Sequence, residues 1–133
     1  MELLFTISDV FNATNINLAE RLGATDNGTQ YVEQWCLERQ DEVLDYIASY
    51  AWNGREQANR YANSPFLAKH IVEAIMHQIR YVLDNEGQGN IGAILLGANR
   101  VTKLTVNERL EAVIAPKAHR VLETHGLLYR GRL

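Results

Sequence analysis

SPFLAKHIVEAIMHQIRYVL, residues 64–83, is the stretch that most clearly predicts a helical fold. Ser64 is a residue type that caps helix N-termini, and Pro65 fits the first helical position because that position needs no N–H donor. The apolar residues of this stretch recur every three or four positions, as they do on one face of a helix. They are Phe66, Leu67, Ile71, Ile75, Ile79, Val82 and Leu83. We therefore expect a long amphipathic helix that ends at Asn85.

A second long amphipathic helix is expected upstream, from Thr29 to about Ala51. Its apolar residues recur at helical spacing, and its acidic residues fall mainly on the opposite face. The apolar set is Val32, Trp35, Cys36, Val43, Leu44, Ile47 and Tyr50, and the acidic set is Glu33, Glu38, Asp41, Glu42 and Asp45. Because only a short linker separates the two long helices, we expect them to pack antiparallel.

The remaining segments have weaker patterns. Residues 8–22 predict a helix capped by Ser8, although their asparagine-rich middle allows a break or a start near Asn15. Residues 55–63 fit either a short helix or a loop, and residues 88–104 fit an irregular or β-hairpin insertion. The predicted fold class is therefore mainly α, a small helical bundle with one such insertion.

The C-terminal part predicts two short helices and a tail. Residues 105–114 begin with the spacing of a capping box and predict a helix that ends or bends near Pro116. Another helix is expected over residues 116–124, with Gly126 in the position of a C-cap glycine. The seven residues after Gly126 are apolar and then basic, so we expect them to extend as a tail.

Length and composition limit the possible classes of protein. A chain of 133 residues fits a single domain, which we place at residues 1–126, with residues 127–133 as a docking tail. No segment is apolar over the ~20 residues needed to cross a bilayer, and residues 1–5 make a poor signal peptide. The single cysteine, Cys36, excludes an intramolecular disulfide, and we expect it to be a buried, inert thiol.

The histidines are the first candidates for a chemical site. His70, Glu73 and His77 lie near one side of the helix that begins at Pro65, and all three are metal-ligand types. His70 and His77 are two turns apart, about 10 Å along the axis, so we interpret the three as ordinary polar-face residues. His119 and His125 lie near a helix C-terminus, where the dipole favours a cation. With no nucleotide-binding or nucleophile motif in the sequence, we expect no enzymatic activity, no cofactor and no metal.

Charge is distributed unevenly along the chain. Residues 1–50 carry a net charge of −7, and residues 51–133 carry +4. Oppositely charged ends favour head-to-tail pairing of copies or binding to an acidic partner, although helices with differently charged solvent faces give the same pattern. Residues 100–133 alone carry +4 and could contact phosphates, so a small DNA-binding or DNA-packaging protein is the alternative prediction.

The order of these segments resembles the small head-to-tail connector, or adaptor, proteins of tailed bacteriophages. The resemblance covers most of the chain. It rests on a short N-terminal helix around Ile7-Ser8-Asp9-Val10, an acidic helix from Tyr31 that ends in YIASYA, the Ser64-Pro65 helix and the tail LLYRGR. It implies a ring, commonly of twelve subunits, stacked below the portal, with DNA passing through its centre. The insertion at residues 88–104 departs from a simple bundle.

The sequence therefore predicts a structural, non-enzymatic virion protein that joins the portal to a tail or neck protein. As a homo-oligomer of this kind it would be made in the host cytoplasm and would not bind DNA sequence-specifically. Tyr and Arg are enriched at the centres of protein interfaces, which supports docking through the tail. The residues expected to bind the partner are Leu127, Leu128, Tyr129, Arg130, Arg132 and Leu133.

Overall fold

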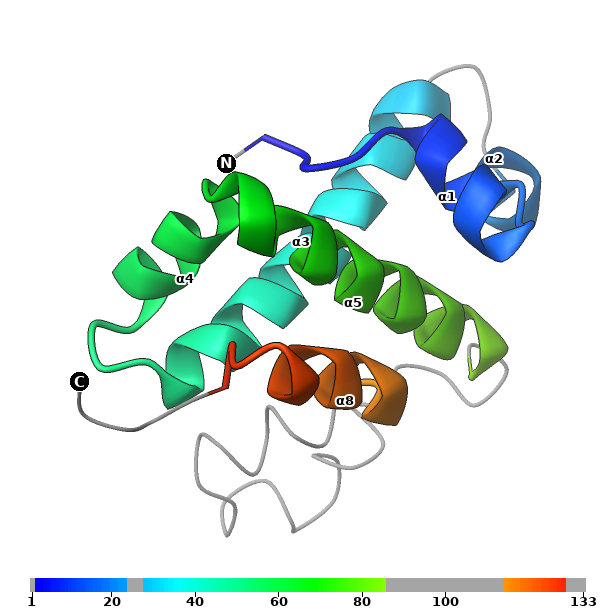
Figure 1. Cartoon of the computed structure of the whole chain (residues 1–133). Coiled ribbons are helices and arrows are strands. Elements are labelled where there is room, and N and C mark those ends of the chain that lie inside the picture. The colour runs from blue at the N-terminus through cyan, green and yellow to red at the C-terminus, as the bar shows by residue number, and fades with distance from the viewer. Residues whose placement is uncertain (1, 24–27, 86–113, 129–133) are drawn as a thin grey trace, which may run out of the picture.

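The computed structural model describes residues 2–23, 28–85 and 114–128, and these are mainly helical with no strand among them (Figure 1). The predicted mainly α class is confirmed. The helices are α1 (Ile7–Thr14), α2 (Leu18–Arg21), α3 (Gly28–Tyr50), α4 (Arg55–Ala62), α5 (Pro65–Asp84) and α8 (Pro116–Thr124). The predicted insertion at residues 88–104 and the predicted helix before Ile114 lie outside the described residues, so both stay predictions.

Helix α5 begins and ends where the sequence predicts. Pro65 is its first residue, Ser64 precedes it with extended backbone, and Asn85 follows its last turn. The Ser64 side chain makes no capping hydrogen bond, so the start of α5 owes more to Pro65 than to the cap. Most of the predicted inner face is buried, but Phe66 is 78% exposed and points away from the core.

The N-terminal segment forms two helices instead of one. Thr6, not Ser8, caps α1, through a capping box in which Thr6 and Asp9 bond each other's backbone N–H. Asn15 ends α1 in the left-handed region at φ 61°, a conformation that asparagine adopts more readily than most residues. Asn17 then caps α2 by accepting a hydrogen bond from the backbone N–H of Glu20. The break that the asparagine-rich sequence allowed is therefore confirmed.

The two long helices, α3 and α5, pack on each other but cross in Figure 1, so the predicted antiparallel pairing is wrong. Antiparallel helices of a bundle are inclined by only about 20° and so run side by side along their length. The linker between them contains a helix of its own, α4, which packs on both and turns the chain before α5 begins. Helix α8 is the one that runs back along α5, as Figure 1 shows.

Two buried glutamines connect helices through polar contacts. Gln40 on α3 accepts a 2.9 Å hydrogen bond from the backbone N–H of Leu4 and donates one to the carbonyl of Glu2, which holds the N-terminal segment on α3. Gln78 on α5 accepts a 2.7 Å hydrogen bond from the backbone N–H of Ala115, which fixes the start of α8. Buried side-chain amides that are bonded in this way specify one arrangement of the helices.

Helix α8 completes the apolar core. Ala118 and Leu122 on its inner face are fully buried, next to the isoleucine face of α5. None of the helices that the structure describes is both long and apolar enough to span a membrane.

Candidate functional site

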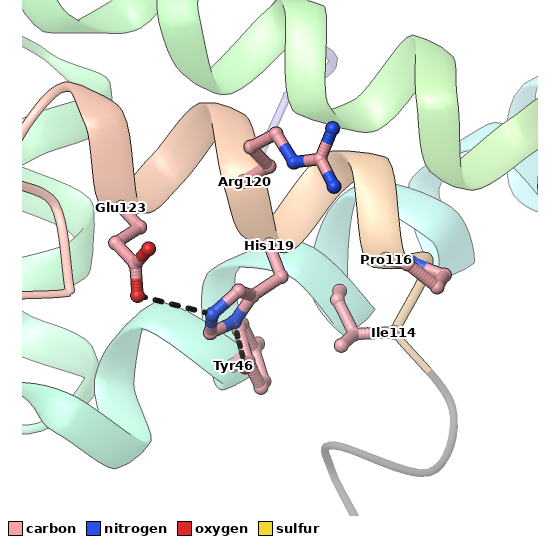
Figure 2. Close-up of a pocket in the computed structure, with 6 residues that line it drawn as sticks. All are labelled: Tyr46, Ile114, Pro116, His119, Arg120 and Glu123. Carbon is pink, nitrogen blue, oxygen red and sulfur yellow. Dashed lines mark hydrogen bonds and ion pairs between the residues drawn. The ribbon is translucent and has the colours of Figure 1, made fainter.

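A surface hollow of about 620 Å³ lies between α3 and α8. Figure 2 shows its lining, in which His119 of α8 reaches Tyr46 of α3 and Glu123 of α8 is directed at His119. Among the described residues, its lining also includes Ile114, Pro116 and Arg120. The position of the hollow follows from the packing of α8, because the Gln78 contact at Ala115 sets where α8 begins.

A chain of polar contacts crosses one wall of this hollow. The Tyr46 hydroxyl bonds His119 Nδ1, and His119 Nε2 lies 3.3 Å from the Glu123 carboxylate, as the dashed lines in Figure 2 mark. In neutral His119 the tautomer that suits both partners has Nδ1 accepting from tyrosine and Nε2–H donating to glutamate. The Tyr50 hydroxyl lies 3.3 Å from that of Tyr46 and extends the chain along α3.

The geometry of this chain fits a structural junction better than a catalytic centre. Tyr46 is 1% exposed, and its ring packs edge to face on the rings of Tyr50 and His119, with centroids 5.3 and 5.7 Å away. Both nitrogens of His119 are engaged by protein groups, so neither is directed at a substrate in the hollow. The junction therefore ties α8 to α3. The sequence did not predict it, because Tyr46 and His119 are far apart in the chain.

A second cluster joins the other long helix to the end of α8. The imidazole rings of His70 on α5 and His125 after α8 are stacked, with centroids 3.4 Å apart and planes 12° apart. Glu73 completes the cluster, and one ligand atom from each of the three residues lies within 4.8 Å of the others. The pKa of His70 is lowered by desolvation and then by its neighbours His125 and Lys69, against the opposing effect of Glu73.

The metal-ligand candidates from the sequence are thus only partly brought together. His70 and Glu73 lie in one cluster, but its third member is His125 and not His77. His77 is not part of this cluster and lines a surface hollow with Glu73 and Asp9, next to α1. Spacing along one helix could not reveal His125, because it reaches the cluster through tertiary packing.

The predicted docking tail is wrong at its first two residues. Leu127 and Leu128 are 2% and 9% exposed and belong to the core, so the folded domain extends beyond Gly126. The reason is the turn that ends α8. Gly126 has φ 75°, and the backbone N–H of Leu127 bonds the carbonyl of Leu122 at 2.9 Å, as in a Schellman motif. Tyr129, Arg130, Arg132 and Leu133 lie outside the described residues.

Cys36 occupies the environment that the sequence predicts. It is a free thiol that is fully buried in α3. Burial raises its pKa to about 11, while Arg39 acts to lower the pKa and Glu33 to raise it. A thiol with so high a pKa is almost entirely protonated at neutral pH and is a poor nucleophile.

The acidic face of α3 is partly neutralised by neighbouring arginines. Arg55 on α4 bonds both Asp41 and Asp45, at 2.9 and 2.6 Å. Arg39 Nε lies 2.8 Å from a Glu42 oxygen, and the Arg39 guanidinium lies 4.7 Å from the centre of the Trp35 ring. The charge that this helix presents to solvent is therefore smaller than its sequence suggests.

Large apolar side chains remain exposed at several places on the described surface. Trp52, in the turn between α3 and α4, is 86% exposed. Phe66, Tyr31 and Phe11 are 78%, 53% and 50% exposed. Aromatic residues are enriched at protein–protein interfaces, so these are the described positions most suited to anchor a partner.

Comparison with known proteins adds no family to this picture: no protein-family model, no curated protein and no solved structure matches the chain.

Proposed function

We propose that this protein is a structural subunit of a bacteriophage head-to-tail connector, assembled as a ring that joins the portal to the tail. In this role the helical domain is a building block, and its chemistry is that of binding. The assembled protein is then a component of the virion. The residues of the tail that carry the predicted contact with the portal are Tyr129, Arg130, Arg132 and Leu133.

The observation that carries a binding role is the exposure of Trp52. A tryptophan that is 86% exposed in a short turn contributes little to its own fold, and it offers a large apolar area to a partner. It directly follows the YIASYA end of the acidic helix, which is one of the segments that resembles the connector proteins. We assign Trp52 to the contact between neighbouring subunits.

The charge distribution supports the same assignment. A ring is closed by one heterologous contact that is repeated between copies, and such a contact joins two different surfaces. The N-terminal half of the chain is acidic, whereas α8 exposes Lys117 and Arg120. The ion pairs of Arg55 reduce the acidic charge but leave Glu33 exposed on α3, and Glu38 is exposed beside Arg39, 3.4 Å away.

Native mass spectrometry tests the proposal at moderate salt. The untagged protein is measured alone and after mixing with the portal protein of the same phage. We expect a closed oligomer of many copies, either alone or on the portal. A protein that stays monomeric or dimeric in the presence of the portal contradicts the connector role.

The variant Trp52→Ala tests the assigned contact. Because the side chain is exposed, we expect the fold to be unchanged by circular dichroism and assembly to weaken at least about 10-fold, as for an interface hot spot. Tyr31→Ala is the matched control, since it removes an exposed aromatic side chain at the opposite end of α3, roughly 30 Å away. Equal assembly of Trp52→Ala and wild type would show that the contact lies elsewhere.

The DNA-binding alternative is distinguished in the same samples. It predicts an affinity for duplex DNA that falls steeply with salt and is lost when Arg130 and Arg132 are both changed to alanine. The connector role makes a different prediction for a ring that forms without the portal at moderate salt. Neither added DNA nor the two arginine substitutions should alter the measured mass of that ring.

A further inference from the structure

We propose that His70, Glu73 and His125 form a binding site for a divalent transition-metal ion, Zn²⁺ in the first instance. The bound ion would tie the end of α8 to the first turns of α5. This inference is independent of the connector role, because it concerns only the helical domain.

The donor set is the first argument. Two imidazoles and one carboxylate are the ligands that zinc prefers, whereas Mg²⁺ and Ca²⁺ take mainly oxygen ligands. His70 and Glu73 are three residues apart on α5, so both side chains project from the same side of the helix. His125 comes from another element, and the three ligand atoms already lie within 4.8 Å of one another.

The backbone around His125 is the second argument. His125 is the C-cap residue of α8, and the turn that follows is fixed by the left-handed Gly126 and by the hydrogen bond from Leu127 to Leu122. The burial of Leu127 then fastens this turn to the core. The ligand from α8 therefore projects from a fixed backbone and not from a loose chain end.

Metal binding requires a limited movement of side chains. In the stacked arrangement the two ring planes are nearly parallel, and because imidazole lone pairs lie in the ring plane, they do not converge on one ion. Zinc binds imidazole nitrogen at about 2.0–2.1 Å, so the rings must turn until their nitrogens converge. Glu73 and His125 are exposed and His70 is only partly buried, so these rotations leave the core unchanged. Water completes the tetrahedral coordination in this arrangement.

Isothermal titration calorimetry with ZnCl₂ tests the site on untagged protein that has been dialysed against a chelator. At pH 7.5 we expect one Zn²⁺ per chain, and a melting temperature that rises by roughly 5–10 °C when free zinc is about one hundred times Kd. His125→Ala, His70→Ala and Glu73→Gln should each weaken binding by at least about 10-fold, which at the same free zinc reduces the rise in melting temperature to about half or less. Mg²⁺ at the same concentration should leave the melting temperature unchanged.

His77→Ala is the matched control, because it removes a neighbouring histidine of α5 that lies outside the cluster. It should bind Zn²⁺ as the wild type does. Three results would overturn the proposal: no zinc binding by the wild type, binding that His125→Ala leaves intact, or binding that depends on His77 instead. Circular dichroism of each variant without metal confirms that the fold is retained, which is expected because none of the substituted side chains is buried.

Discussion

Helix α8 presents two histidines to two neighbouring helices, and their surroundings differ. His119 meets α3, where the buried Tyr46 hydroxyl and the Glu123 carboxylate engage its two nitrogens. His125 meets α5, where it stacks on His70 beside the exposed Glu73. The first arrangement satisfies the imidazole within the protein, whereas the second gathers donor groups at the surface. The role of each histidine therefore depends on the residues that tertiary packing brings next to it. His119 links two helices through its hydrogen-bonding partners, whereas His125 lies among side chains that can bind a metal ion.

The largest loss of stability is expected from a substitution at Leu127, whose burial fixes the position of His125. Leu127→Ala removes a side chain that is 2% exposed, and we expect the free energy of unfolding to fall by about 2–4 kcal/mol. Urea denaturation followed by circular dichroism measures this loss. Zinc affinity should fall as well, because the turn that holds His125 loses its apolar anchor.

Leu67→Ala is the control for that prediction. Leu67 is only partly buried on α5, so its replacement should lower the free energy of unfolding by less than Leu127→Ala does. A loss below about 1 kcal/mol for Leu127→Ala would mean that residues after Gly126 are a tail, as the sequence suggested. The same result would leave His125 without a fixed backbone.

Leu127 was predicted to lie in a tail but is buried in the core, and this difference shows which features the sequence could predict. Ser64-Pro65 and Pro116 located the starts of α5 and α8, because proline at the first helical position acts locally. An apolar residue after a C-cap glycine is a local signal too, since it commonly packs back on the helix it follows. The burial of Leu127 and Leu128 was therefore predictable from the glycine that precedes them.

Features that depend on tertiary packing were not predictable in the same way. The crossing of α3 and α5 depends on α4, whose polar sequence fitted a helix or a loop equally well. The spacing of His70 and His77 involves one helix only, whereas His125 comes from a different part of the chain. The contact between Tyr46 and His119 likewise joins residues that no spacing rule connects.

The junction on α3 should show an intermediate effect. His119→Ala removes the α8 partner of the buried Tyr46 hydroxyl, and we expect a loss of about 1–2 kcal/mol in the free energy of unfolding. Tyr46→Phe should cost a similar amount. In a double-mutant cycle measured by urea denaturation, the two losses should sum to more than the loss of the double variant, because both remove the same contact. Fully additive losses would contradict a specific hydrogen bond between them.

The smallest change in the free energy of unfolding is expected for a substitution at His125. In the absence of metal, His125→Ala should change the free energy of unfolding by no more than about 0.5 kcal/mol, because the side chain is exposed and its main contact is a stacked ring at the surface. The measurement is the same urea titration, made in the presence of a chelator. With zinc present, the difference between wild type and His125→Ala should widen, since only the wild type gains stability from the bound ion. A loss above about 1 kcal/mol without metal would instead make His125 a structural residue like His119, and the contrast between the two histidines would disappear.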